Sequence, residues 1–166
     1  TNGAKAEAYA HDLLKSYGID VKYQPFEVES WDRKTLAVKV GSTPMKAVTL
    51  AHSPVAANVT ATIIDAGNGL EADYKLLGDK VKGKIALIYL GVLPGSPQGT
   101  SSLHRSEKTA LATKYGAVGV MIINTVKNGV LLTGTASVTG KLIPIPAVCI
   151  GLENGMALKE KLKSET

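Results

Sequence analysis

The sequence predicts a β-rich α/β fold. Nearly continuous apolar runs at 85–90 and 118–125 are typical of strands buried on both faces, and a helical segment at 104–117 lies between them. A strand, a crossover helix and a second strand in this order form a βαβ unit with parallel strands. The chain has 166 residues, 45% of them hydrophobic and 20% charged. This is enough for one domain, or for one domain and part of another, with a buried core.

The first segment predicts an amphipathic helix that ends at Gly18, a residue typical of the position just after a helix C-terminus. Its apolar side chains recur at helical spacing and form a single stripe: Ala6, Tyr9, Ala10, Leu13, Leu14 and Tyr17. Such a stripe must pack against another surface.

Alternating apolar residues predict further strands, and the first of them, around Pro25, reads as an edge strand. These strand segments are 21–30, 35–42, 44–54 and 57–67. Two further strands are expected at 129–141, which is broken by glycines, and at 143–151, which has two prolines at its start. A short helix or turn is expected at 70–84 and a closing helix at 152–164. Ser106 is the expected N-cap of the helix at 104–117, and Gly116 its end. The aromatic residues are concentrated near the N-terminus, which places a domain seam within 30–46.

The charge pattern argues against a nucleic-acid-binding protein. The formal net charge is +5, but the lysines are spread along the chain and only 5% of the residues are aromatic. Nucleic-acid sites need clustered cations with aromatic groups beside them. No apolar run is long enough to span a membrane.

The metal-ligating residues do not form a recognisable site. Cys149 is the only cysteine, which excludes an intrachain disulfide, a cysteine-based zinc ribbon and an iron–sulfur cluster. Its place in an apolar strand predicts a buried thiol. His104 and Glu107 share an i, i+3 spacing, but a zinc site needs three or four ligands, and His11 and His52 lie far away in sequence. No metal ligand is therefore assigned.

No catalytic constellation is recognisable either. Ser96, Ser101 and Ser102 precede His104, but no orienting acid accompanies them, and there is no nucleophile elbow or phosphate-binding loop. The carboxylates that fall in polar turns are expected to be solvated: Asp65, Glu71, Asp73 and Asp79. No catalytic residue is assigned.

The candidate binding element is the loop 91–105, which follows the strand at 85–90 and is rich in Gly, Pro and Ser. Irregular loops of this length are commonly functional or disordered. The residues expected to form a contact surface are Pro94, Ser96, Gln98, Ser102, His104 and Arg105.

Three segments together resemble a protease-associated (PA) domain. They are the Gly83-Lys84-Ile85 strand start, the helix end Tyr115-Gly116-Ala117-Val118-Gly119-Val120, and Ile145-Pro146-Ala147-Val148 before a closing helix. The segment "GAKAEAYAHDLLKSYGIDVKYQPFEV" is similar to the first helix and strand of the catalytic domain in M28-type zinc aminopeptidases and carboxypeptidases, many of which carry a PA domain inserted soon afterwards.

This resemblance implies a PA-type swivelling β/β/α fold, with mixed β-sheets and flanking helices. It implies two parts: residues 1–40 as the edge of a peptidase domain, and 41–163 as the PA domain. It further implies a non-catalytic lid or interaction role beside a peptidase domain of the same parent chain, with peptide as the substrate. The family's zinc ligands and general base would follow the insertion, so zinc is expected in the parent and not in this chain.

The resemblance also implies a secreted or periplasmic protein. The stripe of the first helix, lacking its sheet, is then expected to be exposed, disordered or buried in a dimer. Two alternatives stay open. One is a free-standing peptide- or protein-binding module with no peptidase partner in cis, and the other is a small hydrolase with an unrecognised site.

Overall fold

The computed structural model describes residues 1–28 and 32–164, which fall into two compact units, Thr1–Asp32 and Arg33–Thr166. The first unit contains helix α1 (Asn2–Ser16). Thr1 caps its start, where the side-chain oxygen accepts a hydrogen bond from the Ala4 amide at 3.3 Å.

Helix α1 ends at a glycine, as predicted. Gly18 has φ +77° and donates its amide to the Lys15 carbonyl, while the Ile19 amide reaches back to Leu14. A left-handed glycine with these two bonds is a common helix ending. None of the helix residues is buried, and Tyr9 and Tyr17 are 70% and 71% exposed. The apolar stripe therefore lies at the surface.

The edge strand predicted at 21–30 is wrong over residues 21–28; residues 29 and 30 lie outside the described residues. Residues 21–28 form no strand, and the ring of Tyr23 stacks on His11 with 4.6 Å between the ring centroids. A strand needs a partner to satisfy its backbone hydrogen bonds, and no described segment pairs with this one.

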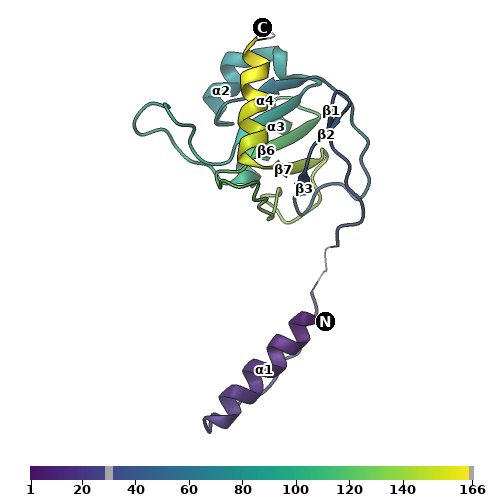
Figure 1. Cartoon of the computed structure of the whole chain (residues 1–166), viewed down its shortest axis with the longest axis vertical. Helices are drawn as coiled ribbons and strands as arrows, with labels where there is room; N and C mark the ends of the chain where they lie inside the picture. The colour runs from purple at the N-terminus through teal and green to yellow at the C-terminus, as the bar shows by residue number, and fades with distance from the viewer. Residues whose placement is uncertain (29–31, 165–166) are drawn as a thin grey trace. The chain divides into compact units, whose positions relative to one another are not determined.

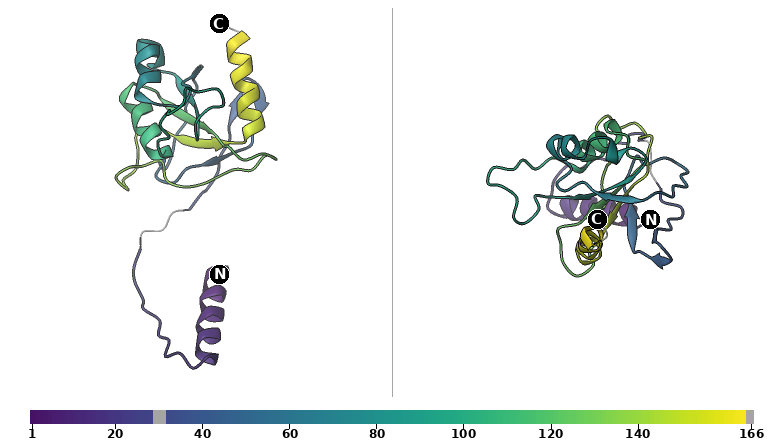
Figure 2. Two further views of the ribbon diagram at one scale, coloured as in Figure 1. Left: turned by 90° about the vertical axis from the view of Figure 1, so that its left-hand side faces the viewer. Right: turned by 90° about the horizontal axis from the view of Figure 1, so that it is seen from above.

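The second unit is built on a five-stranded mixed sheet in the order β3-β7-β6-β5-β4 (Figures 1 and 2). The strands are β3 (Ala47–Thr49), β4 (Ile63–Asp65), β5 (Ile85–Tyr89), β6 (Gly119–Ile123) and β7 (Ala147–Ile150). The four strands from β4 to β7 are parallel, and β3 runs antiparallel at one edge. A two-stranded antiparallel pair, β1 (Lys39–Val40) and β2 (Thr43–Pro44), precedes the sheet.

Helices cover both faces of this sheet (Figure 2). One face carries α2 (Glu71–Leu77), the 3-10 helix η1 (Gly78–Val81) and α3 (Arg105–Lys114), and the other carries α4 (Leu152–Ser164). Alternate residues of each central strand face opposite layers: Ile88 and Ile122 pack under α2 and α3, while Leu87 and Ile123 pack under α4. Burial on both faces explains the continuous apolar runs in the sequence.

The predicted βαβ unit is confirmed, because β5, α3 and β6 follow in order and the two strands are parallel. The predicted strand at 35–42 shrinks to Lys39–Val40, and the one at 143–151 to Ala147–Ile150. The predicted strand at 129–141 is wrong, since it makes only one isolated bridge, between Thr135 and Ala51.

Candidate functional site: loop 91–105 and its base

Loop 91–105 leaves the carboxyl end of β5 and projects from the body of the second unit before it enters α3 (Figure 1). In parallel α/β sheets, this end of the strands is where ligands commonly bind. Of the residues expected to form the contact surface, Pro94, Gln98, Ser102 and His104 are exposed. They are displayed to solvent, as a contact surface requires.

Ser96 plays a different part, because it is half-buried and bonded to the loop's support. Asn68, which is buried between β4 and α2, donates its side-chain amide to Ser96 Oγ at 2.9 Å. The Asn68 carbonyl oxygen accepts the Leu93 amide at 2.7 Å. One buried side chain therefore fixes two points in the first part of the loop.

Lys108 fixes the start of the same loop. It lies in α3, its side chain is fully buried, and its ammonium donates to the carbonyls of Tyr89, Leu90 and Gly91 at 2.7, 2.9 and 2.8 Å. Burial lowers the pKa of Lys108 to about 8, while the field of the Asp73 carboxylate acts in the opposite direction.

His104 is the N-cap of α3, so the expectation of Ser106 as the cap is wrong. His104 Nδ1 accepts the Ser106 amide at 3.3 Å, and Glu107 Oε2 accepts the His104 amide at 2.7 Å. This reciprocal pair is a capping box, which explains the i, i+3 spacing of His104 and Glu107 without a metal ion. Within the described residues, no group of three or more His, Cys, Asp or Glu side chains could hold a metal.

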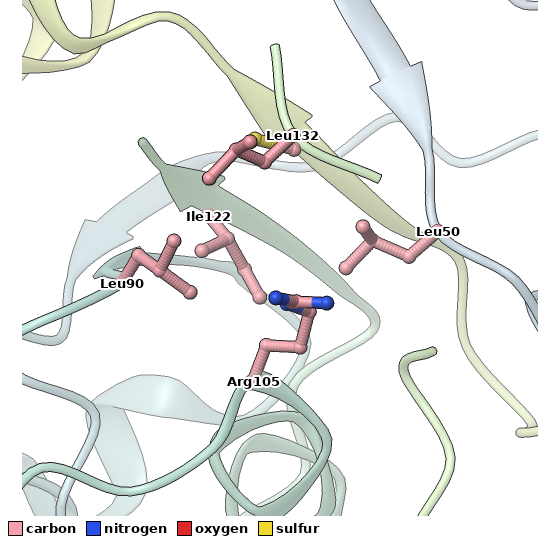
Figure 3. Close-up of a pocket in the computed structure, with 6 residues that line it drawn as sticks. Leu50, Leu90, Arg105, Ile122 and Leu132 are labelled. Atoms are coloured by element: carbon pink, nitrogen blue, oxygen red, sulfur yellow. The ribbon is translucent and has the colours of Figure 1, made fainter. Parts of the chain in front are cut away.

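Arg105 is half-buried and packs against the body of the second unit. Figure 3 shows its side chain among Leu50, Leu90, Ile122 and Leu132. The guanidinium donates to the Thr133 carbonyl at 3.2 Å, and a side chain at Gly134 would collide with it. Arg105 therefore anchors a neighbouring loop.

The PA domain family model matches residues 51–158, which is well over half of the chain. The chain belongs to the PA domain family. The resemblance to PA domains of M28-type aminopeptidases is thereby confirmed, together with the mixed α/β fold that it implies.

This chain is similar to parts of three longer aminopeptidases. It is 30% identical over 152 residues to the probable leucine aminopeptidase 2 of Aspergillus oryzae, which covers 90% of this chain and 28% of the relative. An aminopeptidase from Aneurinibacillus sp. strain AM-1 matches with a TM-score of 0.68 and 30% identity, over 98% of this chain and 36% of that one. The zinc aminopeptidase BSAP from Bacillus subtilis matches with a TM-score of 0.66 and 26% identity, over 94% and 35%. The chain thus spans about a third of the length of these proteins or less.

The remaining candidate residues of the PA domain are not brought together. His52 Nδ1 lies 2.8 Å from Thr135 Oγ1. Cys149 is buried, as predicted. Burial raises the pKa of its thiol, while a hydrogen bond from the Leu132 backbone amide acts in the opposite direction. His11 belongs to the first unit, where it contacts Asp12 at 3.0 Å. None of these groups forms a catalytic arrangement with another in the described parts of the chain.

Asp65 corrects the expectation that the carboxylates are solvated. It ends β4, and both of its oxygens accept from the ammonium of Lys159 on α4 at 2.5 Å, with the Lys159 side chain only 6% exposed. Asp65 Oδ1 also accepts the Gly67 amide at 2.9 Å. Asp79, by contrast, is exposed as expected.

Glu71 also has fixed partners, Lys114 and Tyr115, which line a groove of about 440 Å³ between α2 and the end of α3. Lys114 and the Tyr115 hydroxyl both donate to Glu71 Oε1 at 2.9 Å, and these two bonds lower the pKa of the carboxyl. Tyr115 stacks on the buried ring of Tyr74. Charged groups that line this groove are therefore already paired: Lys114 with Glu71, and Lys82 with Asp79.

Three buried polar residues that support the site were missed by the sequence reasoning: Asn68, Lys108 and Lys159. A signal existed for one of them. Lys108 lies three and four residues before Leu111 and Ala112, on the face of α3 that packs on the sheet. A lysine in that position had to be buried together with acceptors.

Proposed function

We propose that this PA domain is a non-catalytic part of a zinc-dependent aminopeptidase of the M28 family, where it shapes the access of peptide substrates. The observation that carries the proposal is the match to aminopeptidase chains over 98% and 94% of this chain, including the segment before the PA domain match. The peptidase domain of the same parent chain is the proposed partner.

The exposed helix α1 supports this assignment. Its apolar stripe is not covered by other residues of the first unit, and amphipathic helices are stable when such a face is packed. We propose that residues 1–40 form the N-terminal edge of the peptidase domain and that residues 41–163 form the PA domain. Pairing of two α1 stripes in a dimer is the alternative that a measurement of mass in solution tests.

Loop 91–105 is the proposed contact element of the domain. Its far part, around Gln98 and Ser102, is exposed, while its near part is held by Asn68 and Lys108. A rigid base with an exposed tip can reach a peptide or a neighbouring domain without disturbing the core.

The described residues contain no group of three or more side chains that could hold a metal ion. We propose that the zinc ligands of the parent lie elsewhere in its chain. None of the described helices is both long enough and apolar enough to cross a bilayer. Secretion or a periplasmic location stays a prediction from the resemblance.

The first experiment is to read the parent gene beyond the codon for Thr166. A His-x-Asp after a strand, followed by an acidic pair, supports the peptidase assignment. A stop codon contradicts it and leaves the alternative, a free-standing peptide- or protein-binding module that uses the same loop.

The second experiment tests the access role in the parent enzyme. Residues 97–102 are replaced by Gly and Ser, and kcat/KM is measured with leucine p-nitroanilide and with a peptide of eight residues. We expect the value for the long peptide to change several-fold and the value for the small substrate to stay constant. The matched control replaces the exposed segment 55–60 in the same way. Equal effects on both substrates, or none, contradict the access role.

A further inference from the structure

We propose that Lys108 is the positioning residue of loop 91–105, and that opening of the near part of this loop is coupled to the hydration of its buried ammonium. The inference goes beyond the proposed function, because it concerns the order of the loop itself, whatever the loop contacts.

The hydrogen bonds of Lys108 all go to the point where strand β5 becomes loop. The carbonyl of Tyr89 belongs to the last residue of the strand, and those of Leu90 and Gly91 to the next two residues. An ammonium has three protons, so these three acceptors satisfy it completely. Removing the ammonium leaves three carbonyls without this donor at a buried place.

The loop falls into two parts with different support. The near part, 91–96, is held by Lys108 and by the two bonds of Asn68. The far part, 97–103, makes only a local turn, in which Thr100 donates to the Pro97 carbonyl. The position of the exposed tip is therefore set by the bonds of the near part.

Lys108 has no carboxylate within ion-pair distance among the described residues. Residues 85–103, which include β5 and most of the loop, contain no charged side chain, and neither does β6. On α2, Asp73 is the group whose field favours the ammonium. On α3 itself, Arg105 turns to Thr133 and Glu107 caps the helix.

This arrangement predicts the direction of the pH dependence. In the closed loop the pKa of Lys108 is about 8, against an ordinary value of 10.5 when the side chain is in water. Between these two values the open loop binds more protons than the closed loop. The opening equilibrium should therefore be constant below pH 8 and fall as the pH rises toward 10.5, by up to about tenfold per pH unit.

The test uses amide hydrogen exchange in this chain, followed by NMR at Leu93 and Ser96, with each rate divided by its intrinsic rate. Lys108→Met keeps an unbranched side chain that is one atom shorter, and removes its donors. We expect it to raise the opening constant at both amides about tenfold or more, and to abolish the pH dependence. Lys108→Arg, which keeps the charge and donors, should restore part of the protection. Lys80→Met, on the exposed surface of η1, is the matched control and should change neither amide.

The amides of β6 separate a local effect from general unfolding. If Lys108→Met leaves Leu93 and Ser96 within twofold of the wild type, or raises exchange equally in β6, the positioning role is wrong. If the variant does not fold, the wild-type pH series decides alone: a flat profile from pH 8 to 10 overturns the coupling. Both outcomes are independent of peptidase activity, so they do not depend on the proposed function.

Discussion

Replacement of Gly155 by Ala sets two opposing effects against each other in helix α4. An alanine in a helix interior is favoured over glycine by up to about 1 kcal/mol. At this position, however, a Cβ atom would lie 2.5 Å from Ile123 Cγ2 and 2.6 Å from Ile123 Cγ1, and Ile123 is fully buried in β6. Carbon atoms in contact are normally about 3.5–4.0 Å apart, so α4 or β6 must move by about 1 Å.

The steric effect should win. Overpacking of a well-ordered core costs about 1–3 kcal/mol, so we expect Gly155→Ala to lower the free energy of unfolding by about 1–2 kcal/mol in spite of the better helix propensity. The measurement is urea denaturation followed by circular dichroism at 222 nm. Gly3→Ala in α1 is the matched control, because a Cβ there meets only Thr1 Oγ1 at 3.8 Å and should not destabilise.

A second background tests the cause. Ile123→Ala removes the two nearest atoms and leaves only the Ile123 Cβ, at 3.0 Å. In that background Gly155→Ala should cost much less or be neutral, so the two sites should couple by about 1–3 kcal/mol. If Gly155→Ala stabilises the wild type, or destabilises both backgrounds equally, close packing of α4 on β6 is not the reason for the glycine.

Three further predictions concern the polar groups of the second unit. Asp65→Asn should destabilise by about 2–4 kcal/mol in urea denaturation, because it leaves the buried Lys159 ammonium without its counter-charge, and Asp65→Asn/Lys159→Met should recover most of this loss. The pKa of Glu71 is lowered from 4.5, chiefly by its hydrogen bond with Lys114, so the carboxylate contributes stability above pH 4.5 that is lost as the pH falls below this value. Glu71→Gln should therefore weaken the dependence of the melting temperature on pH in the acid range. The Cys149 thiol should react with a thiol reagent far more slowly in the native protein than in urea.

The central sheet could be predicted from the sequence because strands buried on both faces appear as continuous apolar runs. The runs at 85–90 and 118–125 are apolar at nearly every position, and Gly18 and Gly116 have the positive φ angles that end their helices. The segment at 21–28 alternates in the same way as a strand, and the segment at 129–141 is strand-like but broken by glycines. Their conformation depends on whether a partner strand is near, which no local pattern records.

The candidate site was harder to predict for a related reason. Loop 91–105 could be recognised from its composition, but the roles of its residues depend on distant partners. Ser96 bonds with Asn68, 28 positions away, and Arg105 with Thr133, also 28 positions away. Two of the six expected contact residues therefore serve as internal anchors, which only the tertiary structure can show.

The buried lysines supply hydrogen-bond donors at the carboxyl ends of the parallel strands. Polar groups at these strand ends, the Asp65 carboxylate of β4 and the backbone carbonyls where β5 becomes loop, lie wholly or partly inside the protein and need donors. Each helical layer supplies one ammonium to this edge: Lys159 from α4 binds Asp65, the last residue of β4, and Lys108 from α3 binds the carbonyls of the last residue of β5 and of the two residues after it. Cations with long, flexible side chains can reach these acceptors from the helices that cover the sheet. The edge that carries loop 91–105 is thus held by charge on both sides of the sheet, so the exposed tip of the loop can vary in sequence without loss of the fold beneath it.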